Sequence, residues 1–164
     1  VGSEMCIRDR LTTRRIPQLY YGTEVMMNGV KSKSDGYVRK DFPGGWTGDA
    51  TNALTPAGRT KIQNECYDFY KTILNWRKGN DVIAKGNMVQ FMVQNGVYAY
   101  ARQYEGKTVF VMLNGTDAET TVPLKFYKEI LKNSKQGKDI LSGKAITFGE
   151  ELKMGPRESL VIEL

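Results

Sequence analysis

Hydrophobic and polar residues follow four successive patterns along the chain. Residues 16–21 form a short apolar run that Gly22 ends, and residues 25–53 show no period. Residues 55–78 then repeat apolar side chains every three or four positions, whereas the period after Asp81 is two. The pattern predicts a buried strand, a long loop, a helix and a set of short strands, in that order.

The helix prediction rests on signals at both ends and on one apolar face. Thr55 is an N-cap residue, and Pro56 takes the first helical position, where its missing N–H costs nothing. Gly79 and Asn80 end the helix. The apolar face comprises Ile62, Cys66, Phe69, Ile73 and Trp76. We therefore expect Cys66 to be a buried core thiol and Trp76 to be a core side chain.

Turn signals divide the residues after Asp81 into short strands. Asn95-Gly96 separates two alternating runs and is a strong hairpin signal, and Glu105-Gly106-Lys107 predicts a second turn. Residues 126–132 are long enough for one or two helical turns. The expected strands are residues 89–93, 97–102, 108–113, 120–124, 140–141, 145–148 and 159–164. Such strands with regular turns predict a small antiparallel β-sandwich.

Charge and cysteine content narrow the classes of function. The chain has 164 residues, with 24 Lys and Arg against 18 Asp and Glu, so a basic nucleic-acid-binding protein is one hypothesis. Few aromatic residues accompany the lysine cluster, so we favour a solvated lysine face and expect no nucleic-acid partner. No apolar run approaches the roughly 20 residues of a membrane span, and Cys6 and Cys66 form no metal-binding spacing. The lysine cluster comprises Lys125, Lys128, Lys132, Lys135 and Lys138.

The segment from Arg15 to Glu24 resembles the eighth barrel strand and following loop of α-amylase-family glycoside hydrolases. In that family Gly-x-Pro enters a short apolar strand that ends in Gly-x-Glu. Pro17, Gly22 and Glu24 fit this motif, while Arg15 stands where the first glycine belongs. Residues 39–46, 52–55 and 75–78 resemble the branch of cyclomaltodextrinases, neopullulanases and starch-utilisation amylases.

The resemblance implies an α+β fragment in two parts. Residues 11–80 correspond to the end of a catalytic (β/α)8 barrel, with strand 8, a long loop and helix 8. Residues 81–164 correspond to the C-terminal β-sandwich domain. Residues 1–10 lack an apolar face and resemble translated adapter sequence, so we expect them to be a non-native leader.

The resemblance also implies a function in carbohydrate metabolism. The chain is expected to be the C-terminal part of a glycoside hydrolase acting on α-1,4-glucans or cyclodextrins. Retaining glycosidases use two carboxylates about 5–5.5 Å apart, and no residue of this chain resembles the family's catalytic set. The chain also has no histidine. We expect no catalytic residue, metal site or cofactor in this chain, and expect it to be inactive alone; a calcium requirement of the full enzyme is open.

The long loop carries the candidate substrate-binding residues. Asp35 and Arg39 resemble a family Asp-x-x-x-Arg element near the nonreducing-end sugars, although an ordinary loop salt bridge is the alternative. Trp46 follows two glycines and either stacks on a pyranose ring or packs against the helix. Gly22 and Glu24 mark the strand end, where Glu24 either holds the loop root or contacts sugar.

Other interpretations stay open at this point. The β-domain and Trp46 would suit a noncatalytic carbohydrate-binding module, and the charge balance would suit a basic interaction protein. Tyr98, Tyr100 and Tyr104 suggest either a sugar-binding surface or half-buried strand residues, and we favour the second. Family resemblance implies a periplasmic or cytoplasmic bacterial protein, and leaves the linkage preference and the oligomeric state undecided.

Overall fold

The computed structural model describes residues 10–13 and 16–164, so the expected leader lies outside the described residues except for Arg10. The chain divides into two compact units. The β unit comprises Ile73–Leu164 together with the N-terminal residues as far as Pro17, and the loop unit comprises Gln18–Thr72. No helix among the described residues is long and apolar enough to cross a membrane.

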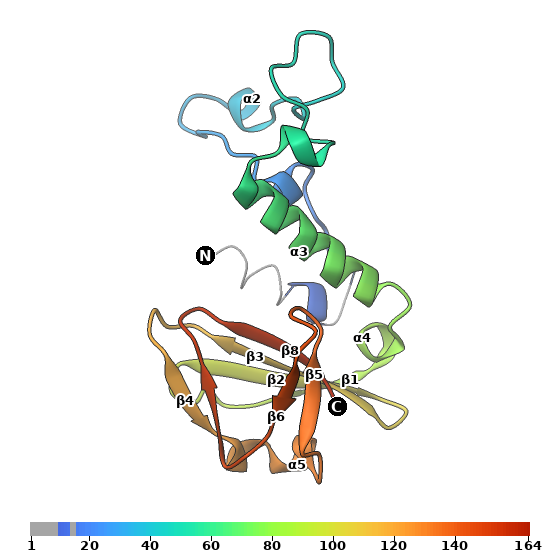
Figure 1. Ribbon diagram of the computed structural model, residues 1–164, viewed down its shortest axis with the longest axis vertical. Helices are drawn as coiled ribbons and strands as arrows, with labels where there is room; N and C mark the ends of the chain where they lie inside the picture. The colour runs from blue at the N-terminus through green and yellow to red at the C-terminus, as the bar shows by residue number, and fades with distance from the viewer. Residues whose placement is uncertain (1–9, 14–15) are drawn as a thin grey trace. The chain divides into compact units, whose positions relative to one another are not determined.

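The β unit contains two antiparallel sheets (Figure 1). The larger sheet has six strands in the order β1-β2-β3-β8-β5-β6, and β4 pairs with β7 in the smaller one. This arrangement confirms the predicted antiparallel β-domain. The strand bounds are β1 Asn87–Gln90, β2 Val97–Tyr104, β3 Lys107–Asn114, β4 Thr120–Pro123, β5 Gln136–Asp139, β6 Ala145–Thr147, β7 Glu151–Met154 and β8 Ser159–Glu163.

The central strands of the larger sheet are buried on both faces. Ala99 and Phe110 point into one apolar cluster, the sandwich core, which the smaller sheet and the segment Leu124–Leu131 help to enclose. Tyr100 and Val111 point into a second cluster, the helix-side core, which includes Val82, Ile83, Val109, Leu113 and Val161. Alternate side chains thus enter opposite cores, which explains why these strands are apolar along most of their length.

Two tight turns connect the first three strands as the sequence predicts. Asn95 and Gly96 have φ values of 50° and 78°, and Glu105 and Gly106 have values of 47° and 78°. Positive φ at both central residues is typical of the type I′ turn, whose twist matches that of the flanking strands. The first turn joins β1 to β2 and the second joins β2 to β3.

The later strands depart from prediction in two places. A strand at residues 140–141 is wrong, because β5 is Gln136–Asp139, and β7 at Glu151–Met154 was not anticipated. β5 contains no large apolar residue, so its pairing with β8 and β6 determines it. β7 alternates polar and apolar residues over only four positions and pairs with β4. The predicted helical turns are confirmed as η3 (Leu124–Tyr127) and α5 (Lys128–Leu131).

Helix α3 extends from Lys61 to Arg77, so it starts later than predicted. The Thr55 side chain does act as a cap, but for the short 3-10 turn η2 (Pro56–Gly58). Thr60 and Gln63 form a reciprocal capping box at the start of α3: Gln63 N donates to Thr60 Oγ1 at 3.3 Å, and Thr60 N donates to Gln63 Oε1 at 2.9 Å. Asn80 then caps the short helix α4, Asp81–Lys85, which the sequence pattern did not predict.

The predicted strand at residues 16–21 is wrong in this structure. These residues form no strand, and the described loop unit contains only η1 (Thr23–Val25), α2 (Asp35–Val38), η2 and the first part of α3. Ile16 is 95% exposed. A parallel barrel strand needs a neighbour on each side to pair its N–H and C=O groups, and no described strand pairs with this segment.

Candidate functional site

Gly22 forms the root of the long loop. Its φ is 79°, and its carbonyl oxygen accepts hydrogen bonds from Val25 N at 3.2 Å and Met27 N at 2.9 Å. A Cβ at this position would collide with the side chain of Met27. Gly22 is therefore required both by its left-handed backbone and by the close approach of Met27.

Glu24 is half-buried in the first turn of η1. Within the described part of the chain, its carboxylate has no hydrogen bond or ion pair. The backbone turn is instead stabilised by Thr23, whose N and Oγ1 both donate to Tyr20 O, at 3.2 and 2.6 Å. Both predicted roles of Glu24, holding the loop root and contacting sugar, therefore stay predictions.

Cys66 is only half-buried, so the prediction of a buried core thiol is wrong. Its Sγ lies 3.8 Å from Thr23 O, which it approaches as a weak donor. Ile62, one turn earlier on α3, is exposed. The apolar face predicted for this helix is therefore incompletely covered along the loop unit.

Asp35 and Arg39 form an ion pair across one turn. Ser34 caps α2 by accepting a hydrogen bond from Tyr37 N at 3.1 Å. Asp35 and Arg39 are four residues apart in sequence, so the helical turn brings their side chains to the same face. Arg39 Nη1 lies 3.8 Å from Asp35 Oδ2, and both side chains are well exposed. The pair therefore contributes little to stability but presents a charged donor and a charged acceptor to solvent.

Tyr37 on α2 lies between two lysines. The ammonium groups of Lys33 and Lys40 are 4.6 and 4.4 Å from the centre of its ring. Tyr21 connects this part of the loop to the segment after Ile16, because its hydroxyl donates to Lys40 O at 2.7 Å. The pKa of Tyr21 is raised, chiefly by partial desolvation and secondly by the nearby Tyr20 phenol. The hydroxyl therefore keeps its proton and remains a donor.

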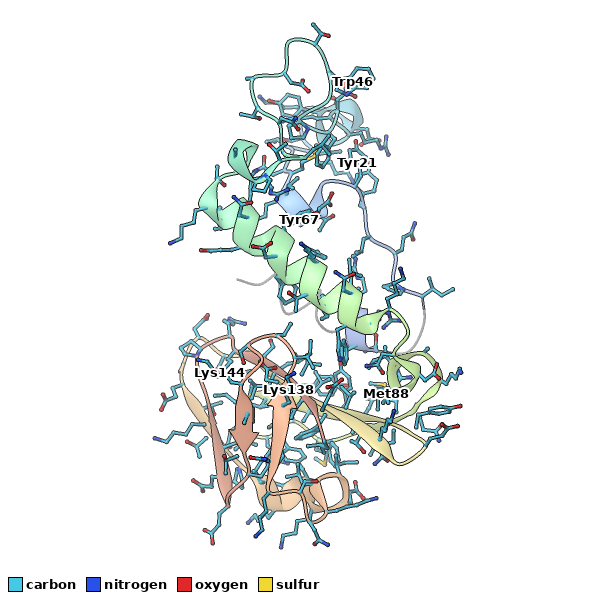
Figure 2. All side chains as sticks on the ribbon, turned by 45° about the vertical axis from the view of Figure 1, so that its right-hand side comes forward. Tyr21, Trp46, Tyr67, Met88, Lys138 and Lys144 are labelled. Atoms are coloured by element: carbon cyan, nitrogen blue, oxygen red, sulfur yellow. The ribbon has the colours of Figure 1, made fainter. Side chains whose placement is uncertain are left out.

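Trp46 is 69% exposed and lies on a loop that extends beyond the start of α3 (Figure 2). Asp49 stabilises this loop, because its Oδ2 accepts hydrogen bonds from Gly44 N at 2.8 Å and Trp46 N at 3.2 Å. At this exposure most of the indole surface faces solvent, which favours stacking over packing against the helix. The indole is therefore a large apolar surface presented to solvent from a hydrogen-bonded loop.

Arg59 anchors the other end of this loop. It is 9% exposed, its Nη1 donates to Ala53 O at 3.0 Å, and its Nε donates to Asn64 Oδ1 at 2.8 Å. Its guanidinium lies 3.9 Å from the centre of the Tyr67 ring on α3. Arg59 thus fixes the end of the Trp46 loop to the helix through two directional bonds and one cation–π contact.

The structure brings some of the predicted site residues together and leaves others apart. Asp35 and Arg39 form an ion pair, and their contact with sugar stays a prediction. No hydrogen bond, ion pair or ring contact between described residues joins Trp46 to them. Sequence reasoning missed Asp49 and Arg59. Asp49 follows Gly48 in a glycine-rich loop, which is a weak signal for a side chain that bonds nearby backbone N–H groups.

Taken together, the loop unit offers exposed aromatic faces and exposed polar groups on a braced backbone. Such a surface suits a neutral ligand that has both apolar faces and hydroxyl groups. Among residues 10–13 and 16–164, no group of three or more His, Cys, Asp or Glu side chains is placed to hold a metal ion. The exposed aromatic residues of the loop unit are Tyr20, Tyr21, Tyr37 and Trp46.

Comparison with known proteins identifies relatives of the chain. Residues 88–163 match the family described as the cyclo-malto-dextrinase C-terminal domain. An α-amylase of Niallia circulans is 27% identical over 154 residues, which cover 89% of this chain and 25% of that protein. A cyclomaltodextrin glucanotransferase of Thermoanaerobacterium thermosulfurigenes is 28% identical over 161 residues, which cover 93% of this chain and 19% of that protein.

Solved structures show the same fold. The crystal structure of an Anoxybacillus α-amylase superposes with a TM-score of 0.74 at 18% identity, covering 98% of this chain and 31% of that one. The fold likeness thus includes both units of the chain. Because the chain spans only 19–25% of the two curated relatives, it is similar to their C-terminal regions and not to the whole proteins.

Proposed function

We propose that the chain is the C-terminal part of a glycoside hydrolase acting on α-1,4-glucans or cyclodextrins, because residues 88–163 match the cyclo-malto-dextrinase C-terminal domain family. The relatives, an α-amylase and a cyclomaltodextrin glucanotransferase, support this substrate class. The proposal assigns the two catalytic carboxylates to residues outside this chain.

We further propose that residues 11–80 are the end of a (β/α)8 barrel in the longer protein, with its last strand, a long loop and its last helix. The fold likeness to an α-amylase over 98% of the chain supports this assignment. So does the exposure of Ile16 and Ile62, which neighbouring barrel elements would cover. In that setting the segment after Ile16 gains the strand neighbours that it lacks here.

The exposed position of Trp46 is the observation that carries the functional proposal. In a (β/α)8 barrel the loops after the strands form the active site, so the loop that begins after Gly22 borders the cleft. Trp46 supplies an apolar plane for a pyranose ring, and Arg39 supplies N–H donors for sugar hydroxyls. Asp49 and Arg59 hold the Trp46 loop in one conformation, so that less entropy is lost when sugar binds.

Variants of the complete enzyme test this role. We predict that Arg39→Ala lowers kcat/KM for short maltooligosaccharides by about one to two decades, because a charge-assisted hydrogen bond is worth roughly 1.5–3 kcal/mol. Trp46→Ala should lower kcat/KM without lowering Tm, because the indole is exposed. Leu54→Ala is the matched control, since Leu54 is an exposed apolar residue that follows the same loop.

Two results would contradict the proposed role of the loop. If Arg39→Ala and Trp46→Ala leave the kinetics unchanged and only shift Tm, residues 35–46 are scaffold and the loop has no part in substrate recognition. If Leu54→Ala reduces kcat/KM as much as Trp46→Ala does, the effect belongs to general disturbance of the loop rather than to stacking on the indole.

A further inference from the structure

A groove in the β unit is lined by aromatic and charged side chains that take no part in the loop site. Its volume is about 610 Å³, within the range of about 300–1,000 Å³ typical of small-ligand sites. It lies where the end of α3 and the start of α4 approach the ends of β2, β3 and β8. Two aromatic residues line it, Trp76 of α3 and Tyr104 of β2, together with polar side chains of α4, β3, β8 and the connecting segments.

Trp76 is not the fully buried core residue that the sequence predicts. It is half-buried: part of its surface packs on the helix-side core, and part lines the groove. Its Nε1 donates to Glu163 Oε1 at 2.6 Å. This bond fixes the orientation of the indole and also holds a carboxylate at the groove wall.

Tyr104 has the same dual environment. It packs partly on the helix-side core and partly lines the groove. Lys85 Nζ lies 5.7 Å from the centre of its ring and 3.1 Å from Asp81 Oδ1. The groove thus has two aromatic side chains supported by one apolar cluster, a geometry in which each ring has little freedom to lose on binding.

The charges of the groove favour a neutral ligand. Its lining includes three carboxylates, from Asp81, Glu105 and Glu163, and two ammonium groups, from Lys78 and Lys107. Lys85, which pairs with Asp81, balances the third carboxylate. Because the two signs nearly cancel, neither an anion nor a cation gains a net attraction. Aromatic surfaces, carboxylates and ammonium groups together match a molecule with apolar faces and many hydroxyl groups.

We propose that this groove is a second, noncatalytic carbohydrate-binding site that holds a short neutral oligosaccharide between Trp76 and Tyr104. The choice of an α-glucan as its ligand rests on the proposed function, whereas the class of ligand follows from the groove. Glu163 and Lys107 provide an acceptor and a donor to hydroxyl groups at the groove wall. A site of this kind would keep the protein on a polymeric substrate between catalytic events.

Tryptophan fluorescence separates the two sites, because Trp46 and Trp76 are the only tryptophans of the chain. In the Trp46→Phe chain, emission reports the groove alone. We expect maltoheptaose to produce a saturable change in this emission. Tyr104→Ala in the same background should weaken binding roughly two- to tenfold, the effect of losing one aromatic contact. Phe126→Ala removes an exposed aromatic side chain that does not line the groove and should leave the affinity unchanged.

A second variant distinguishes loss of binding from loss of folding. Glu163→Gln retains an acceptor for the Trp76 N–H but removes the charge, and it should also weaken binding while far-UV circular dichroism stays unchanged. The proposal is overturned if maltoheptaose gives no saturable change in the Trp46→Phe chain, or if both folded groove variants bind as well as their parent. The Trp76→Phe chain reports the loop separately, so saturation there alone would overturn the groove and leave the proposed function standing.

Discussion

Single polar side chains hold the β unit together where periodicity gives no guidance. Arg102 is fully buried on β2, and its Nη2 donates to Ile83 O at 2.9 Å and Gly86 O at 2.6 Å, so it satisfies carbonyl groups at the end of α4. Asp139 is 2% exposed and accepts a hydrogen bond from Val161 N at 3.0 Å. Each of these side chains connects elements that are distant in sequence.

Arg157 connects two loops through a bidentate ion pair with Asp117. Its Nε and Nη2 donate to the two carboxylate oxygens at 2.7 and 2.8 Å, and its Nη1 donates to Gly115 O at 2.6 Å. The pKa of Asp117 lies below its ordinary value, chiefly because of the hydrogen bonds from Arg157 and secondly because of the positive charge of Arg157. The pair is largely exposed on the Asp117 side, so its contribution to stability is small.

This pair predicts a specific pH dependence. Because the pKa of Asp117 is lower in the folded than in the unfolded state, its stabilisation is present above the unfolded pKa of about 3.9 and is lost as pH falls through the folded pKa. The Tm of Asp117→Asn should therefore lie below that of the parent at pH 5–7, and the gap should close below about pH 4. Glu119→Gln, an exposed carboxylate in the same loop, is the control. A gap that persists unchanged at pH 3 would show that the ion pair does not stabilise the fold.

At the level of elements, the β1-β2 and β2-β3 hairpins have the same turn geometry in different surroundings. Gly96 and Gly106 both have φ of 78°. A Cβ at Gly96 would collide with Thr116 Cγ2, whereas a Cβ at Gly106 would meet nothing within 4 Å. The two glycines therefore separate the cost of backbone strain from that of steric overlap.

Alanine substitutions at the two turns measure this difference. Gly106→Ala should lower the free energy of unfolding by about 1–2 kcal/mol, the cost of a left-handed backbone with a Cβ. Gly96→Ala should cost roughly 1–3 kcal/mol more, because it also overpacks Thr116. Thr116→Ser removes the clashing methyl group and should bring the two costs together in urea denaturation. Equal costs in the parent background would show that Thr116 moves away freely.

The sequence predicted those elements whose signal is local. Asn95-Gly96 and Glu105-Gly106 specify their turns directly. The strand at residues 16–21 and the position of β5 were wrong, because both depend on partners distant in sequence. Asp49 and Arg59 were missed for a different reason: their partners are near in sequence, but they lie in or beside an aperiodic loop whose pattern indicates no bonded pair.

At the scale of the whole molecule, the two units differ in what stabilises them. The β unit has two apolar cores, one on each face of the six-stranded sheet. The loop unit leaves Ile62, Val30 and Leu54 exposed. The lysine cluster of the β unit is also exposed, at Lys125, Lys128, Lys132, Lys135 and Lys138, as expected for a solvated face (Figure 2 labels Lys138). The β unit thus buries its apolar side chains within itself, whereas the loop unit leaves apolar side chains exposed.

The most direct test of the central claim is the release of reducing sugar by the purified chain. Our account predicts no release from maltoheptaose, starch or cyclodextrins, because the catalytic carboxylates are assigned to residues outside the chain. The longer protein, assayed in parallel, should hydrolyse at least one of these substrates. Turnover that copurifies with the chain and disappears on substitution of one of its own Asp or Glu residues would contradict the account.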